Sequence, residues 1–176
     1  MTSLIKACEQ ADFPARISCV ISNKAEALGL KVAQDHGIPT HIVPHTEYDT
    51  KQDFEDALLH KLQNYTIDLI CLAGFMRILS NHFIENAGCD IINIHPSLLP
   101  KYKGLDTHQR ALDAGDIEAG CSVHFVTEGV DEGEVIIQKS VPVLPDDTAQ
   151  TLAQRVLTQE HLIYPEAIRL LAIKKA

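Results

Sequence analysis

Apolar and polar positions along this chain follow two spacings, and together they predict a regular alternation of helices and strands. Residues 51–64 place Phe54, Leu58 and Leu62 on one side of a helix, whereas 68–73 is a continuous apolar run. Such a run is typical of a strand in a sheet that is buried on both faces. The predicted helices are 2–12 (capped by Thr2 and Ser3), 24–36, 51–64, 80–86, 107–113 and 147–171, the last being one helix or two interrupted near Pro165. The predicted strands are 16–22, 40–44, 68–73, 90–94, 121–126 and 134–139.

Strands that alternate with helices are typical of βαβ units. We therefore predict an α/β, Rossmann-like doubly wound fold, in which helices flank a mainly parallel sheet and the two late strands can add an antiparallel edge. No repeat or change of composition divides the chain, so residues 1–176 are expected to form a single domain. Folds of this class begin with a strand and a phosphate-binding loop. Because this chain begins in a helix, we expect the first strand to be missing.

The composition narrows the possible functions. The formal net charge of −9 over 176 residues disfavours general nucleic-acid binding, because phosphate contacts need an excess of Lys and Arg. The five cysteines are odd in number and form no C-x-x-C, which favours buried free thiols in a reducing compartment. The sequence predicts neither a signal peptide nor a membrane span. We therefore expect a cytoplasmic enzyme or binding protein.

The run 93–100, Asn-Ile-His-Pro-Ser-Leu-Leu-Pro, carries the strongest candidate chemistry. Side chains two positions apart share a face of a strand, so Asn93 and His95 point the same way at its carboxyl end, where open α/β sheets bind ligands. An Asn amide can donate to an oxyanion, and a His can move protons near neutral pH. The alternative is an Asn that ends a strand and a hydrogen-bonded His at a turn. Pro96 and Pro100 bracket a rigid turn, which favours acyl-transfer chemistry.

Two further segments have both an ordinary and a functional interpretation. Asp131, flanked by Gly129 and Gly133, is either a plain turn aspartate or a carboxylate that raises the pKa of His95 and orients the imidazole or a water. Segment 72–79 is either core packing with a surface Arg or a loop that holds a flat heterocycle.

Metal binding and covalent catalysis are both disfavoured. The histidines considered as metal ligands are His41, His45, His108 and His124. His108 and His124 lack partners at ligand spacing within one element, and the chain has no HExxH or CxxC. His41 and His45 are four positions apart, but their segment is strand-like and contains Pro44. His124 is therefore expected to pack in its strand. Ser97 lacks a nucleophile elbow and Cys121 lies within a strand, which favours direct attack by a substrate amine.

Several motifs resemble those of folate-dependent formyltransferases and occur in the same order. The most specific is 93–104. The others are 21–25, 73–79, 120–126, 130–133 and 159–161. The resemblance covers nearly the whole chain and is closest to members that formylate glycinamide ribonucleotide.

This resemblance implies a particular reaction, and no metal is expected for the reasons of ligand spacing given above. The formyl group of 10-formyltetrahydrofolate, a co-substrate, passes to the amine of glycinamide ribonucleotide, a step of de novo purine synthesis. By similarity, Asn93 stabilises the tetrahedral oxyanion, and His95 donates a proton and stabilises the same anion. Asp131 raises the pKa of His95 and helps to move the proton from the amine to the leaving nitrogen. These roles agree with those argued from side-chain chemistry.

The resemblance also implies two binding sites. The folate-contacting residues are Lys51, Leu72, Met76, Arg77, Ile78, Leu79, Ile91, Asn93, Thr127, Glu128, Gly129, Val130 and Asp131. Leu72 and Ile91 line the pterin pocket, and loop 127–131 offers backbone groups. The nucleotide-contacting residues are Leu157, Thr158, Gln159 and Glu160, the last through the glycinamide amine. Lys24 and Lys101 are weaker candidates, with a solvated surface role as the alternative.

The sequence departs from the family pattern in two places. Lys51 stands where members usually have Arg, so the charge is kept and the planar fork is lost. Met1 aligns just after a G-x-G-S-N loop that binds the ribonucleotide phosphate in members of the family. We therefore expect fewer phosphate donors, and hypothesise a mis-set start codon or a truncation. A catalytically impaired folate-binding protein is the alternative from a different class.

Two related enzymes are also alternatives. A formyltetrahydrofolate deformylase tends to have His directly after the catalytic His, and a methionyl-tRNA formyltransferase tends to have Ala there. Pro96, the chain length and the acidic charge disfavour both. The expected partners are the two small-molecule substrates, with no nucleic acid and no membrane, for a chain that is a monomer or a homodimer.

Overall fold

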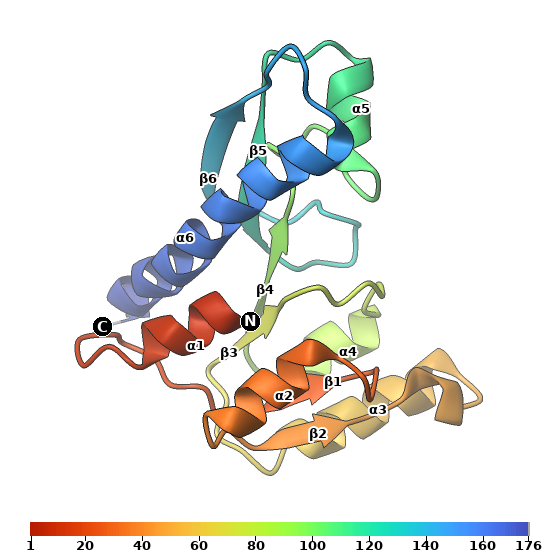
Figure 1. The fold of residues 1–176 in the computed structure, drawn as a ribbon. Helices are drawn as coiled ribbons and strands as arrows, with labels where there is room; N and C mark the ends of the chain where they lie inside the picture. Colours follow the sequence, from red (N-terminus) through yellow and green to blue (C-terminus); the bar gives the residue numbers. More distant parts are fainter. Residues whose placement is uncertain (176) are drawn as a thin grey trace. The chain divides into compact units, whose positions relative to one another are not determined.

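The computed structural model describes residues 1–175 (Figure 1). Packing groups the chain into two compact units, Met1–Ile91 and a second that begins at Ile92. The boundary falls inside strand β4 (Asp90–His95). Because compact packing does not demonstrate independent folding, the single domain expected from the sequence stays a prediction.

The first unit alternates helices with short strands. Its helices are α1 (Thr2–Cys8), α2 (Leu28–Asp35), α3 (Lys51–Leu62) and α4 (Asn81–Asn86), with a 3-10 turn η1 (His45–Glu47). Its strands are β1 (Val20–Ser22), β2 (Thr40–Ile42) and β3 (Leu69–Leu72). Strands β1 and β2 pair in parallel, with Val20 opposite Thr40. With α2 between them in sequence, they form the βαβ unit that the alternation predicts.

Side chains fix the positions of the first unit's helices. Ile5, Val20, Leu30 and Ala33 form one buried apolar cluster that joins α1, β1 and α2. Thr50 caps α3 by accepting a hydrogen bond from the backbone N of Asp53 at 3.1 Å, and Ser80 caps α4 by accepting one from Phe83 N at 3.2 Å. Such caps satisfy donors that the first turn of a helix leaves unpaired.

The second unit is an antiparallel sheet with a long helix packed on it. Strand β5 (Glu118–Phe125) lies between β4 and β6 (Val135–Pro142) and is antiparallel to both. Helix α5 (Thr107–Asp113) lies between β4 and β5 in sequence, and α6 (Ala149–Lys175) packs on β5 and β6 (Figure 1). The late strands thus supply the antiparallel part of the sheet that was expected.

Helix α6 runs without a break through Pro165 and is one helix, not two. A proline in a helix interior costs about 3 kcal/mol because it removes a hydrogen bond and crowds the preceding turn. Here Ile163, Tyr164 and Ala167 are buried around it, so packing outweighs the local preference. None of the helices within residues 1–175 combines the length and the apolar run that a membrane span requires.

Three local predictions were wrong. Helix α1 has Met1 as its N-cap without a side-chain hydrogen bond, so Thr2 and Ser3 lie inside the helix. The residues of β3 are all half-buried, because an apolar run reports side-chain type rather than the number of layers that cover a strand. Among the five cysteines, which were expected to be buried, Cys121 is buried and the other four are half-buried.

Candidate active site

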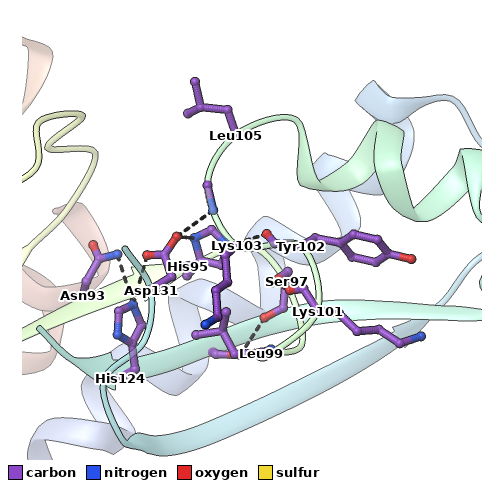
Figure 2. A network of polar contacts seen from close by, with 12 residues as sticks. Asn93, His95, Ser97, Leu99, Lys101, Tyr102, Lys103, Leu105, His124 and Asp131 are labelled. Carbon is purple, nitrogen blue, oxygen red and sulfur yellow. Dashed lines mark hydrogen bonds and ion pairs between the residues drawn. The ribbon is translucent and has the colours of Figure 1, made fainter. Parts of the chain in front are cut away.

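Strand β4 carries Asn93 and His95 on one face, as their spacing predicts. Opposite them on β5, His124 pairs with Asn93 and Ser122 pairs with His95. Residues directly opposed on antiparallel strands point to the same side of the sheet. The side chains of Asn93, His95 and His124 therefore come together (Figure 2), and the two imidazole rings stand edge to face with centroids 6.5 Å apart.

Asp131 joins the two imidazoles. Its Oδ2 lies 3.2 Å from Nδ1 of His95, and its Oδ1 lies 3.4 Å from Nε2 of His124. The same Oδ2 accepts a hydrogen bond from the backbone N of Gly104 at 2.9 Å. The Asp131 side chain is 12% exposed, so the charges interact more strongly here than in water. The structure thus brings together the three predicted catalytic residues, whose roles stay predictions.

The loop between β5 and β6 presents Asp131 through an uncommon backbone conformation. Asp131 has a φ of 52°, in the left-handed region that Asp and Asn tolerate better than most residues. Further along, a Cβ atom at Gly133 would lie 1.8 Å from the carbonyl oxygen of Phe125. Only a glycine lets the loop approach the end of β5 this closely, and this approach directs the Asp131 carboxylate back toward His95.

Both ring nitrogens of His95 face acceptors. Nδ1 faces Asp131, and Nε2 donates to the backbone carbonyl of Tyr102 at 2.9 Å (Figure 2). A carbonyl can only accept, so Nε2 carries a hydrogen. A carboxylate oxygen of Asp131 can accept a hydrogen from Nδ1. This geometry suits a histidine that holds a proton for transfer.

His124 is a site residue that the sequence reasoning missed. It is buried in β5 as expected, yet its Nε2 lies 3.4 Å from the Asn93 amide nitrogen as well as 3.4 Å from Asp131. Its Nδ1 donates to the carbonyl of Phe125 at 2.8 Å. Burial lowers the pKa of His124, more strongly than the Phe125 bond and the Asp131 charge raise it. The sequence did contain a sign of this position, because the polar residues Ser122 and His124 alternate with apolar residues and so share one face of the strand.

The predicted folate segment of the first unit lies between β3 and α4. Met76 is 76% exposed and Ile78 is 59% exposed, whereas Leu79 is buried. The guanidinium of Arg77 lies over the ring of Phe54, 5.6 Å from its centre, at cation–π distance. The segment thus exposes two apolar side chains, against which a flat heterocycle can pack.

The other predicted contacts are distributed over both units. In the first, Lys51 begins α3, Leu72 ends β3, and Ile91 is buried. In the second, 127–131 forms the loop after β5, with Val130 exposed. Residues 157–160 lie on α6, where Leu157 is exposed and burial raises the pKa of Glu160. Their assignment to particular ligands stays a prediction.

Several alternative candidates have structural roles. The ammonium of Lys101 lies 3.0 Å from Asp116; the Lys101 side chain is 59% exposed and that of Asp116 is 18% exposed. Ser97 Oγ donates to the carbonyl of Lys101 at 2.6 Å. Burial raises the pKa of the Cys121 thiol to about 12, so a thiolate nucleophile is disfavoured. Within residues 1–175, no group of three or more His, Cys, Asp or Glu side chains is placed to hold a metal ion.

Known proteins resemble this chain over nearly its whole length. The family model described as "Formyl transferase" matches residues 1–168. The phosphoribosylglycinamide formyltransferases of Haemophilus influenzae and Escherichia coli are each 45% identical over 96% of this chain, which covers 80% and 79% of their lengths. The human trifunctional purine biosynthetic protein adenosine-3 is 45% identical over 98% of this chain, which spans only 17% of that longer protein.

Solved structures give the same result for the fold. The phosphoribosylglycinamide formyltransferase of Brucella melitensis is 52% identical and has a TM-score of 0.92, with 97% of this chain and 88% of that chain covered. The glycinamide ribonucleotide transformylase 1 of Symbiobacterium toebii is 44% identical, with a TM-score of 0.94 over 98% of this chain and 81% of its own. These matches confirm the predicted Rossmann-like α/β fold. With a family model and relatives that match almost all of its residues, the chain belongs to the formyl transferase family.

Proposed function

We propose that this chain transfers the formyl group of 10-formyltetrahydrofolate to the amine of glycinamide ribonucleotide, a step of purine synthesis. The observation that carries the proposal is the cluster of Asn93, His95 and Asp131 beside the end of β4, in a member of the formyl transferase family. Bacterial relatives of which the chain covers about four fifths bear the name of this reaction. We propose that its partners are these two small molecules.

The cluster suits the charges that develop during formyl transfer. As the amine attacks the formyl carbon, the carbonyl oxygen becomes an oxyanion and the attacking nitrogen becomes positive. The Asn93 amide and an N–H of His95 are suitable donors to that oxygen. Asp131 takes up the proton that the amine loses, directly or through a water, and His95 gives a proton to the leaving nitrogen. A proton that passes from Asp131 to His95 then restores both groups.

We assign the formyl donor, a substrate rather than a resident cofactor, to predicted contacts in both units. In the first, the exposed Met76 and Ile78 fit an apolar ring system. Leu72, Arg77, Leu79 and Ile91 complete that set, with Lys51 as a cation for a carboxylate. In the second, the loop residues Thr127, Glu128, Gly129, Val130 and Asp131 offer backbone donors and acceptors.

We assign the nucleotide to α6. Leu157 and Glu160 are three positions apart and so share a face of the helix, next to Thr158 and Gln159. Burial raises the pKa of Glu160, and a partly desolvated carboxylate of this kind is stabilised by an amine cation. Charge-assisted hydrogen bonds would then orient the glycinamide nitrogen.

The test is a comparison of three acceptors with the purified chain and 10-formyltetrahydrofolate. We expect formylation of glycinamide ribonucleotide, little formate release into water, and no formylated methionyl-tRNA. Rapid formate release without the ribonucleotide would identify a hydrolase instead. Loss of turnover in His95→Ala ties the activity to the cluster, and full activity in that variant would refute the mechanism.

A further inference from the structure

We infer that Glu55 is a positioning residue that holds the proposed folate-binding segment from the neighbouring helix. The inference rests on the proposed function, because it assigns the segment between β3 and α4 to the formyl donor. Glu55 lies on α3 and is 1% exposed. A glutamate is almost never fully buried unless it is paired, and no step of the proposed reaction uses this one. Its partners therefore indicate its role.

The buried carboxylate receives donors from two sides. Oε1 accepts the backbone N–H of Ser80 at 2.9 Å, and Oε2 accepts the hydroxyl of the same serine. The ammonium of Lys51, one turn earlier on α3, lies 3.8 Å from Oε1. Hydrogen bonds to an ionised acceptor are stronger than those between neutral groups. Glu55 thus fixes Ser80 through both its backbone and its side chain.

Ser80 ends the segment that displays the apolar side chains. At the other end, Gly74 turns the chain directly after β3 with a φ of 69°. Met76 and Ile78 lie exposed between these two points. A loop that is held at both ends before a ligand arrives loses less conformational freedom on binding, which increases affinity.

Helix α3 contacts the same segment a second time. Phe54, which precedes Glu55, lies under the Arg77 guanidinium. Lys51, which faces Glu55, is itself a predicted folate contact. One carboxylate thereby joins Lys51 to the segment that contains Arg77. We expect this arrangement to act on the affinity for the formyl donor, since Glu55 contacts Lys51 and Ser80, and Ser80 ends the proposed folate-binding segment.

The same two helices offer a matched control. Asp56 follows Glu55 on α3, and its Oδ1 lies 2.7 Å from Nε2 of His82 on α4. This second link is exposed, with 50% of the Asp56 side chain and 41% of the His82 side chain in contact with solvent. Asp56→Asn therefore weakens a polar link between α3 and α4 without changing the Ser80 contacts.

The experiment compares Glu55→Gln with Asp56→Asn in the whole chain. For Glu55→Gln we expect the KM for 10-formyltetrahydrofolate to rise about tenfold. Its kcat and its KM for glycinamide ribonucleotide should stay within about twofold of wild type, because only donor binding is altered. Asp56→Asn should change none of these values. Titration calorimetry with tetrahydrofolate should show the same loss of affinity in Glu55→Gln alone.

A merely structural role gives a different pattern. Less folded protein lowers the maximal rate and leaves both KM values unchanged, and that outcome, or an equal rise of both, overturns the inference. If Glu55→Gln does not fold, Ser80→Ala is tested in its place, because it removes the hydroxyl that Glu55 binds and keeps the backbone bond. This variant also removes the cap of α4, a loss that is expected to lower the amount of folded protein and not to change the donor KM. A smaller rise in the donor KM alone supports the inference, and an unchanged donor KM refutes it. A wild-type chain that formylates no ribonucleotide refutes the proposed function, while calorimetry still tests Glu55.

Discussion

At the scale of single residues, Asp131 connects the other members of the candidate site. Its two oxygens face His95 and His124, and one of them also binds the backbone N of Gly104. Its positive φ adds a second requirement, because few residues other than glycine adopt that conformation without strain. Position 131 therefore needs both a short carboxylate and a tolerance of left-handed backbone, and these two requirements can be separated by mutation.

Asp131→Asn keeps the shape and removes the charge. Asn tolerates the backbone and still accepts from Gly104, so we expect an unchanged melting temperature. The kcat should fall about 100-fold or more, because the proton from the amine loses its acceptor. Steady-state kinetics and thermal melts measure the two effects. Glu132→Gln is the control, since that neighbouring side chain is 57% exposed and pairs with Lys103. A wild-type rate in Asp131→Asn would exclude proton transfer through this carboxylate.

The two hydrogen-bond contacts of His124, one with Phe125 and one with Asn93, can also be separated by mutation. In His124→Asn the amide can replace Nδ1 as donor to Phe125 and cannot reach Asn93, whereas in His124→Gln it extends toward the position of Nε2. We therefore expect kcat to be about tenfold lower in the Asn variant than in the Gln variant, because only the latter can hold the Asn93 amide. Similar rates in both variants would show that the Nε2 contact is dispensable.

His108 predicts how stability depends on pH. Burial, followed by the charge of His95, lowers its pKa below the ordinary 6.5, and its buried Nε2 has no hydrogen-bond partner within residues 1–175. The folded state therefore favours the neutral ring more than the unfolded state does. This contribution is fully present above pH 6.5 and is lost as the pH falls below that value.

The melting temperature should therefore fall between about pH 7.5 and about pH 5.5, and His108→Gln should reduce that fall. His60→Gln, at an exposed position on α3, is the control and should leave the fall unchanged. Equal slopes in wild type and His108→Gln would assign the acid sensitivity to other groups.

At the scale of elements, the site is a junction of β4, β5 and the loop that leaves β5. The register of Asn93 opposite His124 aligns the side chains of the two strands, and the loop then returns Asp131 to them. The strands resist displacement through their ladder of hydrogen bonds, whereas the loop depends on the close approach of Gly133 to Phe125. The position of the carboxylate should therefore be more sensitive to mutation than that of the imidazoles.

Gly133→Ala tests this sensitivity. The added Cβ meets backbone, which cannot rotate away as a side chain would. We expect a loss of about 1–3 kcal/mol in the free energy of unfolding and a lower kcat, because the loop and Asp131 move together. Gly29→Ala on α2 is the control. Its Cβ would lie 3.6 Å from Met1 Cγ, an ordinary contact, and Ala favours a helix. Urea unfolding and steady-state kinetics of both variants measure the two effects. An unchanged kcat in Gly133→Ala would show that the position of Asp131 does not depend on the close approach of Gly133 to Phe125.

At the scale of the whole molecule, the sequence predicted the order of the helices and strands more accurately than it predicted how deeply their residues are buried. It predicted the bounds of α5, and it also predicted α2, α3 and α6, whose apolar positions repeat at helical spacing. It could not predict the half-burial of β3, which depends on layers formed by distant segments. It identified Asn93 and His95 from their shared face, yet His124 became visible only once the register of two strands was known.

The net charge predicts a property of the chain as a whole. At −9, the molecule repels an anionic ribonucleotide at distances where single cations do not dominate. Salt screens such repulsion, so kcat/KM for glycinamide ribonucleotide should rise on the order of twofold between about 0.01 and about 0.15 M salt. The kcat at saturation is the internal control and should not change. A falling kcat/KM would show that nearby cations attract the substrate from a distance.

The bond between His95 and the Tyr102 carbonyl has a consequence for inhibition. An amide carbonyl of the backbone is the same functional group as the formyl amide of the proposed donor, so the protein already holds an internal mimic of its substrate against Nε2. A donor oxygen can take this position only by displacing the mimic, and its measured affinity is then a difference between two similar hydrogen bonds. The backbone around Tyr102 would thus act as an intramolecular competitor, whose strength sets how much donor is needed to saturate the chain.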